Sequence, residues 1–348
     1  MGRSWRLVFG LALLAPACGG DDSSDGSGGA ASTGGAAGSG AAAGAAGAAG
    51  AGGSSGSGGT PSAAKPSPGC SGGGLAPGDS TLKLTHGGVE REYQLHVPPG
   101  YDGKAPLPLV LNFHGYTSNA GQQAAFSAMN AKADSAGFLL VYPQGLQNPG
   151  TGLTSWNAGL CCAFGDTARD DVGFVGAVLD DVFAKSCVDE RRVYATGMSN
   201  GGYLSHRLGC ELANRFAAIA PVAGVLGIPA GDCKPSRPMP VVHFHGTADS
   251  LVAYDGGSLG SSASVPDTFA GWASRNGCSG SPKESFKNGA AHCETYEGCP
   301  AGVEVTLCTI DGMGHCWPGQ SICPFGQSST DVSANDRMWE LFQKSSLP

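Results

Sequence analysis

The sequence RVYATGMSNGG, residues 192–202, is the most informative stretch of this chain. Residues 192–196 carry Val, Tyr and Thr, which is typical of a strand. Gly197 and Gly201 then flank Ser199 two positions away on either side, and a helical segment follows. The pattern G-x-S-x-G between a strand and a helix predicts a sharp turn with Ser199 at its tip.

Both glycines have a steric reason. In so tight a turn, a side chain two positions before or after Ser199 would collide with neighbouring backbone. The amino end of the following helix also favours negative charge beside Ser199. We therefore predict that Ser199 is a nucleophile. The alternative is a Gly-rich strand–helix turn without a catalytic role.

Strands and helices are expected to alternate on both sides of this turn. Repeated β-then-α order predicts a mostly parallel sheet covered by helices on both faces. Chemistry in such sheets lies at the carboxyl ends of the strands. The predicted strands are 92–97, 107–113, 138–142, 192–196, 216–222, 241–245 and 303–310. The predicted helices are 122–136, 172–185 with Asp170 or Asp171 as its cap, 202–213 and 336–344.

A nucleophilic serine needs a base, and the base needs a carboxylate that orients it. The motif HGTAD ends at Asp249, in the loop after a predicted strand. The motif GMGHCWPG follows the last predicted strand and contains His315. We predict Asp249 as the acid, with Asp255 as the alternative, and His315 as the base. Two further histidines are expected to be strand residues that pack beneath the site: His243 and His245.

Acyl transfer also needs hydrogen-bond donors for the oxyanion. The residue after the nucleophile, Asn200, is predicted to offer its backbone N–H. The second donor is expected in the loop after an early strand, where the sequence reads FHGYT. We predict the backbone N–H of Tyr116, with Thr117 as the alternative, and expect His114 to hold this loop in place.

Two tryptophans and three cysteines occur near these motifs. Trp156 and Trp317 are predicted to line an acyl pocket, although tryptophan is also a common loop anchor. Cys316 directly follows the predicted base, and Cys161 and Cys162 lie close to Trp156. On this adjacency we expect a disulfide between the two loops.

The motifs MSNGG, HGTAD and GHCWPG, together with Trp156-Asn157 and Asp171-Val172-Gly173-Phe174, resemble those of secreted esterases of the polyhydroxybutyrate-depolymerase and feruloyl-esterase type. The resemblance covers residues 80–348. It implies the α/β-hydrolase fold and a triad of Ser199, Asp249 and His315. It also places Tyr116 at the oxyanion position, where depolymerase-like relatives often have cysteine.

The first 18 residues have the features of an export signal. Arg3 and Arg6 precede a short apolar run, 7–15, which is too short to span a bilayer. Small residues follow, and then Cys18, as in a bacterial lipoprotein signal. We predict either a lipid anchor at Cys18 or ordinary secretion. Residues 19–78 are rich in Gly, Ala and Ser and are predicted to be a disordered tether; residues 79–348 are predicted to be the catalytic domain.

The composition agrees with an exported globular enzyme. Without Cys18 there remain 12 cysteines of the 13, an even number that favours disulfides in an oxidising compartment. No spacing of cysteines or histidines is typical of a zinc site, so we expect no metal. The predicted reaction implies no organic cofactor either. The net charge is −8 and no run of Lys or Arg occurs, which argues against nucleic acid as a partner.

The expected activity is hydrolysis of carboxylic esters through an acyl-enzyme. The resemblance implies feruloyl or acetyl esters of plant cell-wall polysaccharide as substrates. The alternatives are depolymerisation of polyhydroxybutyrate and, from another class, an inactive surface lipoprotein that only binds. A membrane is expected as a partner only through the anchor at Cys18.

Overall fold

The structure is a computed structural model that describes residues 63–72, 74–162, 166–257 and 263–348. These residues belong to one compact unit, Gly59–Pro348. The predicted signal, the anchor at Cys18 and most of the predicted tether lie outside the described residues.

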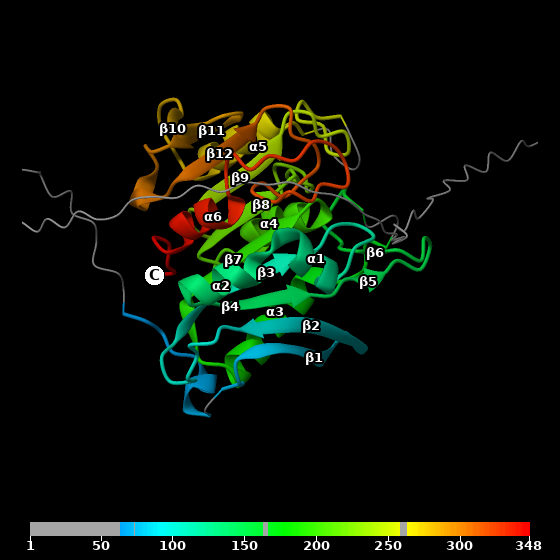
Figure 1. Ribbon diagram of the computed structural model, residues 1–348, viewed down its shortest axis with the longest axis vertical. Coiled ribbons are helices and arrows are strands. Elements are labelled where there is room, and N and C mark those ends of the chain that lie inside the picture. The colour runs from blue at the N-terminus through cyan, green and yellow to red at the C-terminus, as the bar shows by residue number, and fades with distance from the viewer. Residues whose placement is uncertain (1–62, 73, 163–165, 258–262) are drawn as a thin grey trace, which may run out of the picture. The chain divides into compact units, whose positions relative to one another are not determined.

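A ten-stranded sheet forms the centre of the described part (Figure 1). Its six middle strands are parallel, in the order β4 (Leu139–Pro143), β3 (Leu107–Phe113), β7 (Val188–Met198), β8 (Ala218–Val222), β9 (Val241–Gly246) and β12 (Val305–Ile310). Antiparallel strands extend both edges: β1 (Gly78–His86) and β2 (Val89–Val97) beside β4, and β11 (Ala291–Tyr296) and β10 (Lys283–Asn288) beside β12. A separate pair consists of β5 (Leu146–Gln147) and β6 (Thr154–Ser155).

Helices cover both faces of this sheet (Figure 1). One face carries α1 (Ala120–Ser127), α2 (Met129–Ala136) and α6 (Ala334–Phe342). The other carries α3 (Asp171–Lys185), α4 (Asn200–Glu211) and α5 (Val265–Arg275). The 3-10 turns are η1 (Pro68–Ser71) and η2 (Pro300–Gly302). This is the predicted fold class, an α/β-hydrolase-type sheet.

The middle strands are buried on both faces, which explains their nearly continuous apolar sequence. All five residues of β8 are buried. In β7, Val193 points into the core beneath α3 and α4, whereas Tyr194 belongs to the opposite core and stacks on Phe342 of α6 at 4.4 Å. Neighbouring residues of one strand therefore anchor helices on opposite faces.

Several elements differ from the prediction. The predicted helix 122–136 is two helices, because Ala128 has a left-handed conformation (φ 47°) that ends α1 before α2 begins. Asp170 caps α3 by accepting the Gly173 N–H at 2.7 Å, while Asp171 lies inside the helix and is fully buried. The strands β1, β10 and β11 and the helix α5 were not predicted.

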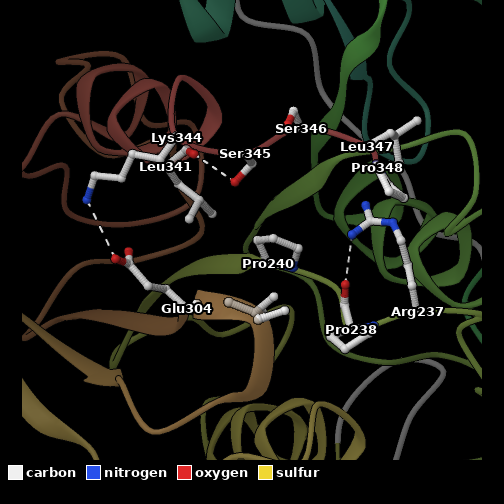
Figure 2. Close-up of a pocket in the computed structure, with 13 residues that line it drawn as sticks. Arg237, Pro238, Pro240, Glu304, Leu341, Lys344, Ser345, Ser346, Leu347 and Pro348 are labelled. Carbon is white, nitrogen blue, oxygen red and sulfur yellow. Dashed lines mark hydrogen bonds and ion pairs between the residues drawn. The ribbon is translucent and has the colours of Figure 1, made fainter. Parts of the chain in front are cut away.

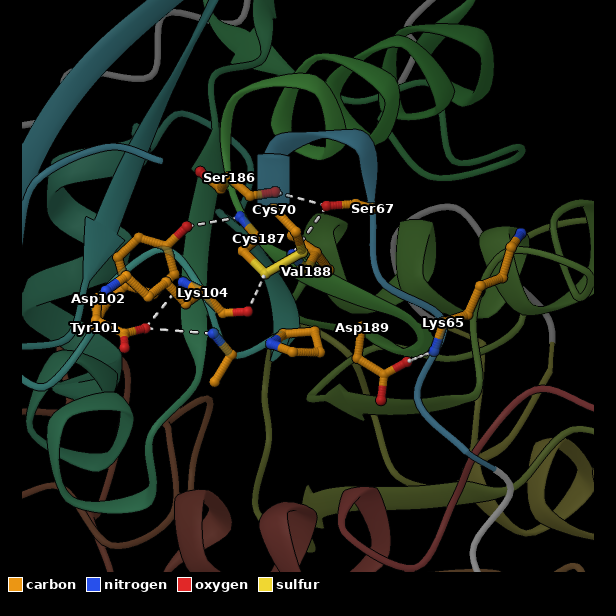
Figure 3. The surroundings of a disulfide bond; sticks show 12 residues. Lys65, Ser67, Cys70, Tyr101, Asp102, Lys104, Ser186, Cys187, Val188 and Asp189 are labelled. Atoms are coloured by element: carbon orange, nitrogen blue, oxygen red, sulfur yellow. Dashed lines mark hydrogen bonds between the residues drawn. A yellow bond between two sulfur atoms is a disulfide. The ribbon is translucent and has the colours of Figure 1, made fainter. Parts of the chain in front are cut away.

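The predicted boundary of the tether at residue 78 is wrong, because residues 63–72 belong to the compact unit (Figure 3). Cys70 forms a disulfide with Cys187, directly before β7. The Ser67 hydroxyl donates to the Ser186 carbonyl at 2.7 Å and accepts the Val188 N–H at 2.9 Å. The chain therefore joins the sheet at the amino end of β7, opposite the end that carries Ser199.

All 12 cysteines of the described part form disulfides, which confirms the predicted framework. The expected bridge between Cys316 and the Cys161–Cys162 loop is wrong, since each of these loops closes on itself. The pairs are Cys70–Cys187, Cys161–Cys162, Cys210–Cys233, Cys278–Cys299, Cys293–Cys308 and Cys316–Cys323.

Candidate active site

Ser199 lies at the tip of a strained turn between β7 and α4. Its backbone has φ 56° and ψ −122°, a region that non-glycine residues seldom adopt. A Cβ on Gly201 would lie 2.1 Å from the Phe113 carbonyl oxygen, and one on Gly197 would lie 2.7 Å from the same atom. Only glycine fits at these two positions, so the steric reason given by the sequence pattern holds in the structure.

Asp249 and His315 meet at the carboxyl edge of the sheet. Asp249 follows β9 and His315 follows β12, and these strands are parallel neighbours with Gly246 opposite Ile310. The His315 Nδ1 lies 2.7 Å from the Asp249 Oδ2. An ionised carboxylate only accepts hydrogen bonds, so Nδ1 carries the proton and Nε2 is left with a lone pair.

The Asp249 carboxylate is buried, and both of its oxygens accept hydrogen bonds. Burial raises its pKa, but hydrogen bonds from His245 and His315 outweigh burial and hold the pKa well below its usual value. Its Oδ1 accepts the backbone N–H groups of Leu251 at 2.9 Å and Val252 at 2.8 Å. The carboxylate therefore stays charged and keeps one orientation toward His315.

The contact with His245 is a feature that the sequence did not reveal. Nε2 of His245 donates to the Val252 carbonyl at 2.8 Å and lies 3.4 Å from the Asp249 Oδ2. His243 lies behind it, with Nε2 3.2 Å from the His245 Nδ1. Both histidines are buried strand residues beneath the site, as predicted. The close spacing in the motif HFHGTAD was the available signal for the contact with the acid.

The loop after β3 lies against the nucleophile. Gly115 is so close that a Cβ there would be 3.3 Å from the Ser199 Cβ and 3.9 Å from its Oγ. The Thr117 N–H donates to the Thr154 carbonyl at 2.8 Å, so this alternative oxyanion donor is already engaged. Tyr116, the predicted donor, lies between Gly115 and Thr117 and is half-buried.

His114 holds this loop in place, as predicted. Its Nδ1 donates to the Gly115 carbonyl at 2.8 Å, and its Nε2 accepts the Gly145 N–H at 2.9 Å. Burial lowers the pKa of His114 to about 4, although the Gly115 hydrogen bond opposes this shift. The ring is therefore neutral near pH 7 and uses both nitrogens to join the loops after β3 and β4.

Asn200, the first residue of α4, ties the nucleophile turn to the Trp156 loop. Its Oδ1 accepts the Trp156 N–H at 2.7 Å, and its Nδ2 donates to the Trp156 carbonyl at 3.1 Å. The same Nδ2 lies 3.7 Å from the Cys161 Sγ. The Cys161–Cys162 disulfide therefore lies directly behind the residue that is predicted to offer the oxyanion N–H.

The predicted acyl pocket of Trp156 and Trp317 is wrong, because both indoles are enclosed. Trp156 is 0% exposed and donates to the His114 carbonyl, and Trp317 is 1% exposed and donates to the Asn335 Oδ1, each at 3.0 Å. Neither ring presents surface to a substrate. Both support the loops around the site from beneath.

A buried ion pair supports the Trp156 loop. Asp171 accepts the Asn157 N–H at 2.7 Å and pairs with Arg91 at 3.0 Å and Arg169 at 2.9 Å. Arg91 also lies 3.7 Å over the Phe174 ring. No local sequence signal indicates Arg91, since it comes from β2, 80 positions before Asp171.

Other parts of the described unit are separate from this edge. A hollow of about 430 Å³ lies at the amino ends of β9 and β12, next to Pro240, Glu304 and Lys344 (Figure 2), opposite the edge with Asp249 and His315.

Within the described residues, His, Cys, Asp and Glu side chains form no group of three that could hold a metal ion. None of the described helices is long and apolar enough to cross a membrane.

Comparisons with known proteins identify the relatives of this chain. The family described as esterase PHB depolymerase matches residues 91–233. Feruloyl esterase B of Piromyces equi is 38% identical over 235 residues, and the chain spans 42% of its length. A putative esterase, NocK, of Nocardia uniformis subsp. tsuyamanensis is 32% identical over 277 residues, which are 72% of this chain and 76% of that protein.

Solved structures share the fold at low sequence identity. Acetyl xylan esterase from Aspergillus awamori has a TM-score of 0.54 at 16% identity, and the match covers 76% of this chain and 99% of that one. A thermostable esterase has a TM-score of 0.52, also at 16% identity, over 77% of this chain and 63% of that one.

Proposed function

Because the chain belongs to the family of polyhydroxybutyrate-depolymerase-type and feruloyl-esterase-type esterases, we propose that it hydrolyses carboxylic esters with Ser199 as nucleophile, His315 as base and Asp249 as orienting acid. The bond of 2.7 Å between Asp249 and His315 carries this proposal, because it leaves the His315 Nε2 able to accept a proton. The strained turn at Ser199, directly after a strand of the same parallel sheet, supports it.

The proposed reaction proceeds in two steps. The His315 Nε2 takes the proton of the Ser199 hydroxyl while Oγ attacks the ester carbonyl carbon. The resulting oxyanion accepts hydrogen bonds from the backbone N–H groups of Asn200 and Tyr116. The bond to the alcohol then breaks as His315 returns the proton to the alcohol oxygen. Water attacks the acyl-enzyme by the same route and releases the acid.

The proposed substrates are feruloyl or acetyl esters of plant cell-wall polysaccharide. The names of several relatives support this class. Feruloyl esterase C of Emericella nidulans is 29% identical over 296 residues, and a bifunctional acetylxylan esterase/xylanase of Neocallimastix patriciarum is 28% identical over 228 residues. The alternative is depolymerisation of polyhydroxybutyrate, which the name of the matched family supports.

Hydrolysis assays with matched acyl donors test this proposal. Methyl ferulate, p-nitrophenyl acetate and an oligomer of 3-hydroxybutyrate should be compared, with Ser199→Ala as the control. Ferulate or acetate release that Ser199→Ala loses is the expected result. Release of 3-hydroxybutyrate alone would favour the depolymerase. No activity on all three, together with no labelling by a fluorophosphonate, would favour a binding protein.

We also propose that the protein acts outside the cytoplasm, attached through a lipid at Cys18. Disulfides persist in oxidising compartments, and all 12 cysteines of the described part are paired. The test is Cys18→Ser in a bacterial host: the wild type should partition with membranes and the variant should be released. Release of both forms would favour ordinary secretion, and retention of both would reject Cys18 as the attachment site.

A further inference from the structure

Phe325 is an exposed aromatic residue beside the proposed base. Its side chain is 52% exposed, although the turn that carries it is closed by hydrogen bonds and a disulfide. Its ring centroid lies 6.4 Å from that of His315, with the rings inclined at 62°. The His315 N–H donates to the Phe325 carbonyl at 2.9 Å, so the backbones of the two residues are directly joined.

The turn that carries Phe325 is closed in three ways. The Gly314 N–H donates to the Gln327 carbonyl at 2.9 Å, and Cys316 and Cys323 form a disulfide across the turn. Gly314 is also so close that a Cβ there would lie 2.5 Å from the Phe325 carbonyl oxygen. The backbone of Phe325 is therefore held against the backbone of the His315 loop.

Packing within the protein does not explain the exposed ring. Apolar surface left in water costs about 25 cal/mol per Å², so a half-exposed Phe on a fixed backbone has no stabilising advantage over a polar residue. Among the described residues, five large apolar side chains are exposed, and four of them lie in loops at the carboxyl edge of the sheet. Of these four, Phe325 is the one whose ring lies beside a triad residue. These side chains are Leu153, Leu160, Ile322 and Phe325, with Val89 the fifth.

The proposed reaction identifies what would cover this ring. His315 must return its proton to the leaving alcohol oxygen, which therefore lies about 3 Å from its Nε2. The group attached to that oxygen therefore lies beside the imidazole, whose ring centroid is 6.4 Å from that of Phe325. On this geometry we propose that Phe325 forms the alcohol-side subsite and packs against the apolar face of a sugar ring. This inference rests on the proposed esterase function.

The chemistry of the ring fits a sugar. Phe has no hydrogen-bonding group, and an exposed aromatic face binds a flat apolar surface without charge. One face of a pyranose or furanose ring consists mainly of C–H groups, while its hydroxyls point outward to water. A methyl ester has no such ring. Phe325 should therefore contribute to sugar-linked esters and leave simple alkyl esters unaffected.

Two substrates with the same acyl group test the subsite: methyl ferulate, and ferulate esterified to an arabinoxylan oligosaccharide. In Phe325→Ala, kcat/KM for the oligosaccharide ester should fall by about tenfold through KM, while kcat/KM for methyl ferulate stays within about twofold. Phe325→Tyr should restore the preference. The matched control is Ile322→Ala, which removes an exposed side chain (61%) from the same turn and should change neither value.

Equal loss on both esters would overturn the proposal, because Phe325 would then only position His315. No loss on either ester would also overturn it. A binding measurement separates this inference from the esterase function: calorimetry of the unesterified arabinoxylan oligosaccharide with Ser199→Ala, with and without Phe325→Ala. Binding that requires Phe325 in a protein without activity on any ester would keep the subsite and reject the esterase. Absence of binding to Ser199→Ala would reject the subsite.

Discussion

The Nδ1 of His315 lies 2.7 Å from the Oδ2 of Asp249, although the two residues are 66 positions apart in the chain. They meet because β9 and β12 are parallel neighbours whose following loops leave the same edge of the sheet. Ser199 leaves that edge at the end of β7, two strands from β9.

Ser199→Ala should lower kcat by about a factor of 10⁵ or more, because the proposed nucleophile is removed while the fold is kept. The measurement is ester hydrolysis, together with covalent labelling by a fluorophosphonate. Ser205→Ala is the matched control, since this buried serine of α4 only donates to the Gly201 carbonyl. Labelling of Ser199→Ala at wild-type level would show that another residue is the nucleophile.

Asp249→Asn should lower kcat by about 10⁴, because an amide in this position can hold His315 in the wrong tautomer. Asp255→Asn is the control: it makes the same chemical change in the same loop, at an exposed position. Steady-state kinetics of both variants decide between the two aspartates. A large loss in Asp255→Asn with little effect in Asp249→Asn would reverse the assignment.

His245→Phe should move the acidic limb of the kcat/KM profile to higher pH. The variant keeps a ring but removes Nε2, which lies 3.4 Å from the Asp249 Oδ2, together with its proton. The hydrogen bond from His245 helps to hold the pKa of Asp249 below its usual value, so its loss raises that pKa, and Asp249 loses its charge at a higher pH. His245→Gln, whose amide can donate in place of Nε2, should restore the profile.

His292→Gln controls for the loss of a histidine elsewhere in the unit and should leave the profile unchanged. An unchanged acidic limb in His245→Phe, with kcat reduced at every pH, would show that His245 only packs beneath the site.

Gly201→Ala should destabilise the protein by about 3 kcal/mol or more, because its Cβ would lie 2.1 Å from the Phe113 carbonyl oxygen, on backbone that cannot move aside. Gly176→Ala in α3 is the matched control. No atom lies within 4 Å of its added Cβ, so alanine should raise stability by about 0.5–1 kcal/mol. Urea unfolding measures both. Similar free energies of unfolding for the two variants would show that the turn at Ser199 can accommodate a Cβ at position 201.

The free energy of unfolding should fall as the pH drops from about 6.5 toward 4. Burial lowers the pKa of His114 to about 4 and that of His206 to about 3. In the unfolded chain these groups bind protons below about 6.5, so the unfolded state gains protons that the native state excludes. Each unit of separation corresponds to about 1.4 kcal/mol.

Urea unfolding at pH 7, 5.5 and 4.5 checks this dependence. His114→Gln should be less stable at pH 7, since it loses the hydrogen bonds to Gly115 and Gly145, and should show a weaker loss of stability on acidification. The same pH dependence in the variant and the wild type would contradict the assignment to His114.

Sequence alone was sufficient for the features that depend on short-range pattern. The turn at Ser199 follows from two glycines at fixed spacing, because their steric reason is local. The positions of Asp249 and His315 follow from strand ends and chain order, since the carboxyl ends of parallel strands share one edge. An even number of cysteines after an export signal was enough to predict that they are paired.

Only the tertiary structure decided which groups lie in contact around these positions. It showed that Trp156 and Trp317 are buried supports and that Cys161–Cys162 and Cys316–Cys323 close within their own loops. It also placed Arg91 against Asp171, 80 positions away. Such contacts depend on the order of strands in the sheet and on side-chain packing between loops, and no residue spacing along the chain encodes either of them.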